Sequence, residues 1–253
     1  MSRPCVWVTR TDPFNRLTAK RLAGAGYETL CAPALRVLGL DVPAVLAVPD
    51  ALAFTSLNGV RLHRFLPALA EIPVFAVGDH SARLAQTCGY RRVRSASGNI
   101  SDLAGTITRE LTAPAAILHI GAARPAGDLG ALLGPRHRVS RLAIYETLES
   151  DRRDLERVAG HIDAIDHMLI HSPRAGAHVA RWLQDVEPHW RGTVHCISDA
   201  AAVPFRSFSR ISIEVASRPD ETSLLAGLMA HRPRSSVAAP RTSEAIRARA
   251  EQG

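Results

Sequence analysis

A sequence pattern that occurs twice, about half a chain apart, constrains the fold of this protein more than any other feature. The segment ALAFTSLNGVRLHRFL, which contains Ser56, matches DHMLIHSPRAGAHVARWL, which contains Ser172. A second pair of segments matches around Gly78 and Ser198, and the two pairs are separated by 116 and 120 residues. Each segment is a short apolar run, then a polar turn, then an amphipathic helical pattern. The repeat predicts two related α/β domains that face each other.

Predicted strands and helices alternate along most of the chain, which is typical of parallel sheets built from βαβ units. Near-continuous apolar strands such as AAILHI indicate sheets that are covered on both faces. The predicted strands are 5–10, 51–56, 73–78, 91–96, 115–121, 167–172, 193–198 and 210–217. The predicted helices are 15–26, 58–69, 80–89, 101–111, 125–134, 152–162, 174–185, 199–208 and 221–232, with a short one near 42–48.

Two extended, β-prone segments interrupt this alternation, at 27–40 and 137–148. They flank a block that holds four complete βα units, so one strand leading out of a lobe and one leading back would explain both. The first βα unit then belongs with the C-terminal block. We predict one discontinuous domain (1–34 and 147–231), a second domain (48–137), linker strands (35–47 and 138–146) and a disordered tail (232–253).

The composition is that of a soluble globular protein, with 46% hydrophobic and 22% charged residues. No apolar stretch reaches the roughly 18 residues of a membrane span, and the N-terminus does not resemble a signal peptide. We therefore expect a cytoplasmic protein with no membrane partner. The four cysteines are isolated, and three lie in apolar segments. This pattern favours buried free thiols over disulfides or a metal site.

The positive charge does not indicate nucleic-acid binding. The last 22 residues carry five arginines and two glutamates, so they supply +3 of the formal +7. The rest of the chain is only mildly basic and has no basic stripe interleaved with aromatic residues. The sequence also lacks HExxH, GxSxG, P-loop and GxGxxG motifs. Zinc peptidase, hydrolase, NTPase and dinucleotide-binding interpretations therefore have no support.

Eight segments over residues 3–231 occur in the order found in one enzyme family. They are VTR (8–10), Pro33 in CAPALRV, FTSLNGV (54–60), AVGDHSARLAQTCGY (76–90), LHIGAARPAGDL (118–129), LAIYETL (142–148), LIHSPRAGAHV (169–179) and IEVASRPDETSLLAGL (213–228). Together they resemble the uroporphyrinogen-III synthase family.

The resemblance implies a two-lobed enzyme with a β-ladder hinge and a cleft between the lobes. It implies a hydro-lyase of tetrapyrrole and heme biosynthesis that cyclises hydroxymethylbilane, a linear tetrapyrrole with eight carboxylate side chains. Water is lost, the last pyrrole ring is inverted, and uroporphyrinogen III is formed. The resemblance also implies that no cofactor or metal is needed, that the partner is this small molecule, and that the chain is a monomer.

Tyr145 is the predicted catalytic residue, because it matches the family's tyrosine near the end of the return linker. Its phenol would donate a hydrogen bond to the departing hydroxyl; the alternative is an aromatic ring that only packs against the hinge.

The predicted substrate-binding residues stand where strands end and helices begin. Helix N-termini offer unpaired N–H groups and a positive dipole end to carboxylates, and parallel strands bring such turns to one edge of a sheet. The alternatives are serines that only cap helices and arginines that only face solvent. The set is Arg10, Ser56, Asn58, Ser81, Arg124, Ser172, Arg174 and Ser198.

The second half departs from the family pattern at two positions. Ala201 stands where the family pattern has a hydroxyl, and Ser198 replaces a usual glycine. These departures leave open a degenerate homologue that binds an anionic small molecule without reacting. A sugar- or nucleotide-dependent transferase with twin α/β lobes is a third interpretation. It would require a phosphate loop or an acidic metal site, and the sequence has neither.

Overall fold

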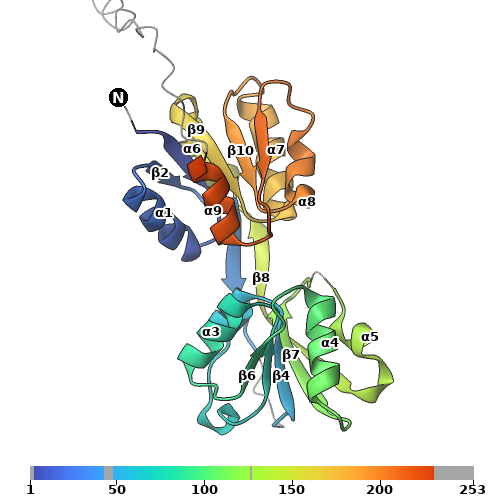
Figure 1. The fold of residues 1–253 in the computed structure, drawn as a ribbon. Helices are drawn as coiled ribbons and strands as arrows, with labels where there is room; N and C mark the ends of the chain where they lie inside the picture. The colour runs from blue at the N-terminus through green and yellow to red at the C-terminus, as the bar shows by residue number, and fades with distance from the viewer. Residues whose placement is uncertain (1–2, 43–47, 126, 231–253) are drawn as a thin grey trace, which may run out of the picture.

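The computed structural model describes residues 3–42, 48–125 and 127–230, which form two α/β lobes joined by β3 and β8 (Figure 1). The five strands of one sheet follow the order β11-β10-β9-β1-β2, and the six of the other follow β3-β8-β7-β4-β5-β6. Every strand pair is parallel except β3 with β8. The predicted fold class is therefore confirmed: two similar, mainly parallel α/β units with a two-strand β link.

The terminal lobe contains both ends of the described chain, because β1 pairs with β9 and β2. Its strands are β1 (Cys5–Val8), β2 (Glu28–Cys31), β9 (Ile165–Ile170), β10 (Thr193–Cys196) and β11 (Ser212–Val215). Its helices are α1 (Phe14–Gly24), α6 (Arg152–Ala159), α7 (Pro173–Val186), α8 (Asp199–Ala202) and α9 (Glu221–Ala230), with 3₁₀ turns η3 (Ile162–Ala164) and η4 (Val203–Phe205).

The middle lobe is formed by the central part of the chain. Its strands are β4 (Ala51–Phe54), β5 (Val74–Ala76), β6 (Val93–Ser95) and β7 (Ala116–Ala122), extended by β3 (Leu35–Gly39) and β8 (Arg138–Glu149). Its helices are α2 (Leu57–Leu62), α3 (Asp79–Cys88), α4 (Ile100–Glu110) and α5 (Leu129–Leu133), with 3₁₀ turns η1 (Pro67–Leu69) and η2 (Gly134–Arg136).

The two linking strands pair with each other as an antiparallel ladder. β8 pairs in parallel with β7 as far as Tyr145, and its last residues, from Tyr145 to Glu149, pair with β3. At the entrance to the terminal lobe, Ser150 donates from its backbone N–H to the Ala34 carbonyl at 3.0 Å and from its Oγ to the Pro33 carbonyl at 2.6 Å. These bonds tie the outgoing and returning strands together where they meet that lobe.

Each lobe has its own apolar core, as expected for sheets covered on both faces. In the terminal lobe, fully buried Trp7 packs edge-on against Trp182 at 5.3 Å and donates its Nε1 hydrogen to the Ala32 carbonyl. In the middle lobe, Phe54 and Phe75 are buried on the faces of β4 and β5. The exact residues at which each domain and linker begins and ends, as given from the sequence, stay a prediction.

Two predicted helices are shorter in the structure than the sequence pattern indicated. The helix expected over 58–69 ends at Leu62, because His63 is extended and its Nδ1 lies 2.7 Å from the Tyr90 hydroxyl. Pro67 then favours an extended preceding residue, and a 3₁₀ turn follows. The helix expected over 199–208 ends at Ala202 and continues as the 3₁₀ turn η4, which contains Pro204.

The prediction of buried thiols is correct only for Cys196. Cys5, Cys31 and Cys88 are half-buried, because each lies at the end of its strand or helix, and all four cysteines are free.

Two predicted segments lie outside the described residues: most of the short helix near 42–48, and the whole tail over 232–253. Within the described residues, none of the helices has the length and apolarity needed to cross a membrane.

Candidate substrate site between the lobes

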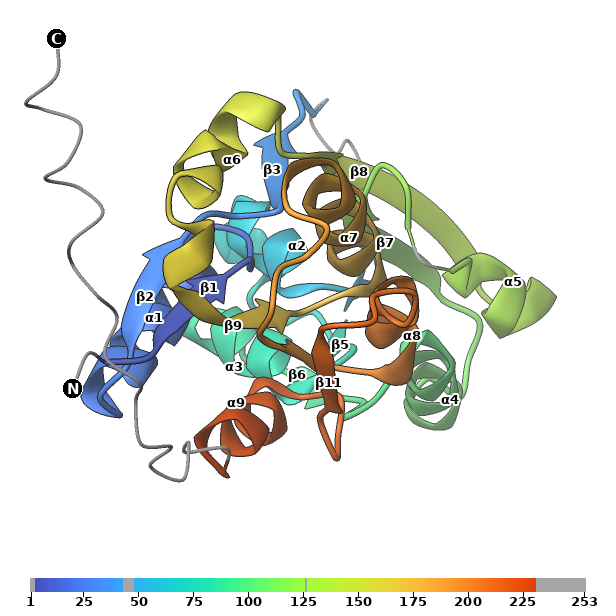
Figure 2. The same cartoon turned by 90° about the horizontal axis from the view of Figure 1, so that it is seen from above.

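A pocket of 240 Å³ lies where the two lobes and the hinge meet. Seen from above, α2 of the middle lobe lies beneath the region between β1 and α7 of the terminal lobe (Figure 2). The lining residues are Thr9, Arg10, Thr11, Phe14, His171, Ser172 and Ala175 from the terminal lobe, Leu35, Val37 and Thr147 from the hinge, and Leu57 and Asn58 from the middle lobe. The volume is below the roughly 300–1,000 Å³ of typical ligand pockets, so a larger ligand must extend beyond it.

Ser56 and Ser172 occupy equivalent places, each capping the helix that follows a buried strand. Ser56 Oγ accepts from the Gly59 N–H at 2.9 Å, and Ser172 Oγ accepts from the Ala175 N–H at 3.2 Å. Ser172 lines the pocket, whereas Ser56 lies just behind it, next to Leu57. Both serines therefore act as N-caps, which stabilises each helix by about 1 kcal/mol.

Asn58 lines the pocket and carries an unsatisfied acceptor. Its Oδ1 is buried and accepts no hydrogen bond from the described part of the chain. A buried acceptor without a donor costs about 1–3 kcal/mol. An N–H or O–H group of a bound ligand would remove that cost once the side chain turns its oxygen toward the pocket.

Tyr145 lies next to the pocket rather than in its wall. The side chain is 5% exposed and belongs to the middle-lobe core, and its hydroxyl lies 2.7 Å from Ser56 Oγ. Burial raises the pKa of the Tyr145 phenol, and the hydrogen bond with Ser56 opposes this in part. The phenol is therefore protonated at neutral pH, as a hydrogen-bond donor must be.

Arg10 supplies the one formally charged side chain among the residues that line the described pocket. Its Nη1 lies 2.6 Å from Glu221 Oε2, and its guanidinium carbon lies 5.1 Å from the centre of the Phe14 ring. The side chain is 23% exposed, so it can meet a ligand while staying anchored on both sides. A planar guanidinium with several N–H donors suits a carboxylate.

His171 was not predicted as a site residue, yet it lines the pocket beside Ser172. Burial lowers its pKa to about 4, and the positive charge of Arg10 acts in the same direction, opposed by Glu221. The imidazole is thus neutral at pH 7. Its position one residue before the predicted Ser172 was the available signal in the sequence.

The other predicted residues do not line this pocket. Ser81 is buried in the first turn of α3, and Ser198 caps α8 by accepting from the Ala201 N–H at 3.4 Å. Arg124 follows β7 and Arg174 lies in the first turn of α7, and both are exposed. The structure thus brings Arg10, Asn58 and Ser172 together in the pocket lining, while Ser56 and Tyr145 contact each other outside it.

Ala201, where the sequence departs from the family pattern, is completely buried in the terminal lobe. A Cβ placed on Gly176 would lie 2.6 Å from the Ala201 carbonyl oxygen, so α7 and α8 pack closely there. Its counterpart Ser81 is also buried. In this conformation a hydroxyl at position 201 would lie in the core, outside the pocket.

Comparisons with known proteins agree on one family. The model of the family described as uroporphyrinogen-III synthase HemD matches residues 17–226. The uroporphyrinogen-III synthetase structure from Helicobacter pylori is similar, with a TM-score of 0.62 and 17% identity, covering 91% of this chain and 100% of that one. A mutant uroporphyrinogen III synthase from the extremely thermophilic bacterium Thermus thermophilus gives a TM-score of 0.54 and 18% identity, covering 90% and 98%.

A search of curated proteins found no match. The two solved structures share the fold, and the family model covers most of the chain. The chain therefore belongs to the uroporphyrinogen-III synthase family.

Proposed function

We propose that this chain cyclises hydroxymethylbilane to uroporphyrinogen III, with loss of water and inversion of the terminal pyrrole ring. Membership of the family supports this reaction. The observation that carries the proposal is the pocket in which Arg10, Asn58 and Ser172 converge from two lobes across a hinge. Such a site can hold two ends of one linear molecule close together.

The chemistry requires orientation more than activation. The substrate carries a leaving hydroxyl beside an electron-rich pyrrole, so ionisation to an azafulvenium cation is intrinsically accessible. The enzyme must then hold the terminal ring so that its substituted position attacks. Fixing two reacting groups in the correct geometry supplies much of the rate acceleration in such reactions.

Carboxylates of the substrate would bind at Arg10 and at the N-terminus of α7. Pro173 is the first residue of α7, and Ser172 already occupies the Ala175 N–H. Arg174 is the second residue of α7, so its N–H has no partner within the helix. Together with the helix dipole, this N–H favours an anion. When the substrate binds, the Asn58 side chain would turn so that its Oδ1, which has no donor in the structure, accepts from a pyrrole N–H.

Tyr145 would assist the departure of hydroxide. Its phenol exchanges Ser56 Oγ for the leaving oxygen when the substrate enters, and its raised pKa keeps the proton on the phenol until then. Ser56 retains the Gly59 N–H, so α2 stays capped. Ser81, Arg124, Arg174 and Ser198 remain proposed contacts for parts of the substrate that extend beyond the pocket.

Product analysis tests the proposal. Purified protein is incubated with hydroxymethylbilane, and the isomers are separated after oxidation. Spontaneous closure without inversion gives the type I isomer, so we expect type III from the protein. Type I alone, at the uncatalysed rate, would contradict the proposal. A monomer in the cytoplasm is the form in which we propose that it acts, and sedimentation with and without substrate tests the oligomeric state.

A further inference from the structure

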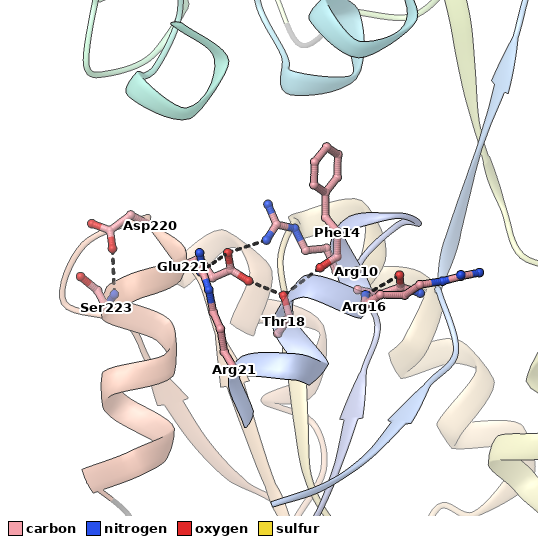
Figure 3. Close-up of polar contacts among 9 residues, drawn as sticks. Arg10, Phe14, Arg16, Thr18, Arg21, Asp220, Glu221 and Ser223 are labelled. Carbon is pink, nitrogen blue, oxygen red and sulfur yellow. Dashed lines mark hydrogen bonds and ion pairs between the residues drawn. The ribbon is translucent and has the colours of Figure 1, made fainter. Parts of the chain in front are cut away.

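Glu221 of the terminal lobe forms an ion pair with Arg10, which lines the pocket. Its Oε2 accepts from Arg10 Nη1 at 2.6 Å and from Arg21 Nη1 at 3.0 Å, and its Oε1 accepts from the Thr18 hydroxyl (Figure 3). The side chain is 10% exposed and does not line the pocket. The carboxylate is therefore fully engaged by its own chain and is not placed to meet a ligand.

The surroundings fix this carboxylate in one position. Glu221 is the first residue of α9, where a negative charge is favoured by the helix dipole. Asp220 accepts from the Ser223 N–H at 2.7 Å, which holds the start of that helix (Figure 3). Burial acts to raise the pKa of Glu221, but the hydrogen bonds from Thr18 and Arg10 and the charge of Arg10 together outweigh it, so the pKa lies below its usual value. The Glu221 carboxylate is thus ionised at neutral pH and held by Arg10, Arg21 and Thr18.

The guanidinium of Arg10 is held between Glu221 and the Phe14 ring, on the side of the terminal lobe that faces the middle lobe (Figure 3). Only Nη1 is used by the ion pair with Glu221, and a guanidinium has five N–H donors in a fixed fork. Arg10 itself lines the pocket, so the donors that Glu221 does not use are available to a ligand there. A ligand carboxylate then does not have to order a free arginine side chain when it binds.

We propose that Glu221 is a positioning residue, which orients Arg10 to receive a substrate carboxylate. This inference rests on the proposed function. Arg21 contacts the same carboxylate but is half exposed and lies outside the pocket, so it offers a matched control.

Steady-state kinetics with hydroxymethylbilane tests the proposal in Glu221→Ala, Glu221→Gln, Arg21→Met, Arg10→Met and Arg10→Met/Glu221→Ala. We expect Glu221→Ala to raise KM about tenfold with kcat changed less than about twofold, because ground-state positioning is lost. Glu221→Gln keeps an acceptor oxygen and should recover part of the loss. Arg21→Met should leave KM within about twofold of the wild type, because Arg10 keeps its partner.

The double variant separates positioning from a structural role. Glu221 in α9 also accepts a hydrogen bond from Thr18 in α1, 203 residues away, so it ties these two helices together. Its removal can therefore lower the melting temperature. If it acts through Arg10, Glu221→Ala adds less than about twofold to KM once Arg10 is already methionine. An equal KM increase in both backgrounds, or an unchanged KM in folded Glu221→Ala, would overturn the proposal.

A binding readout keeps this test independent of turnover. Uroporphyrin III, a stable octacarboxylate, is titrated against the same variants by fluorescence, and we expect the same pattern in Kd. A wild type that binds uroporphyrin III but forms only the type I isomer would end the proposed reaction, while the variant series still tests Glu221. A wild type that neither converts the substrate nor binds this probe would overturn both proposals.

Discussion

The two serine caps at the centre of the molecule are built alike but have different neighbours. Ser172 caps α7, a helix of 14 residues, and shares the pocket with Arg10 and His171. Ser56 caps α2, a helix of six residues, and pairs with Tyr145 of the hinge. The repeat thus supplies the same cap in both lobes, while neighbouring elements supply a charge on one side and a phenol on the other. The difference fits the two tasks proposed above, carboxylate binding in the terminal lobe and assistance to the leaving group in the middle lobe.

The largest expected effect comes from removing the phenol of the middle-lobe pair. Tyr145→Phe keeps the ring in the core but removes the hydroxyl that contacts Ser56. We expect kcat to fall about 10²-fold, because general-acid assistance typically contributes 10²–10⁴-fold. Rapid-quench turnover with hydroxymethylbilane measures kcat, and circular dichroism checks the fold. Turnover at the wild-type rate would remove Tyr145 from the mechanism.

A smaller effect on stability distinguishes the two caps. Ser172→Ala should lower the free energy of unfolding by about 1 kcal/mol, since it loses only a cap. Ser56→Ala also loses the bond with Tyr145 and should cost about 2 kcal/mol.

Urea unfolding measures both losses, and Ser56→Ala in the Tyr145→Phe background should cost only the cap. Equal losses for the two single variants would show that the hydroxyl pair contributes nothing to stability.

The smallest expected effect concerns pH and is confined to the terminal lobe. His171 has a pKa of about 4 in the folded chain, against about 6.5 when exposed. Between these values the unfolded chain binds more protons, so stability falls as pH drops from about 6.5 to 4. His171→Gln should reduce this slope in melting temperatures taken across that range. A slope equal to that of the wild type would contradict the assigned burial.

The alternation of strands and helices could be predicted from sequence, because it rests on local periodicity. The two hinge strands and the shared terminal lobe could be predicted because two extended segments interrupt that alternation on either side of a complete block of βα units. The end of α2 could not, since His63 leaves the helix to contact Tyr90, which is distant in sequence. The same holds for the pocket. Thr9 and Phe14 come from the first βα turn, and Thr147 comes from the hinge. Only the fold brings these segments together.

The fold brings only some of the candidate residues at strand ends to the pocket, and the sequence pattern could not show which ones. Parallel strands place Ser81 in the first turn of α3 and Ser198 at the N-cap of α8, but position at a sheet edge does not decide which side chain reaches the pocket. Glu221 carried no local signal, because its role depends on Arg10 and Thr18 at the other end of the chain.

The isomer ratio of the product, measured with the pocket open and with it filled, tests the central claim most directly. Thr147→Trp places a large ring in the pocket, and Ser140→Trp places the same ring at an exposed position of the same strand, β8. We expect type III uroporphyrinogen from the wild type and from Ser140→Trp, and mainly type I from folded Thr147→Trp. Undiminished type III formation by Thr147→Trp, or type I alone from the wild type, would contradict a pocket that holds the reacting ends of the substrate.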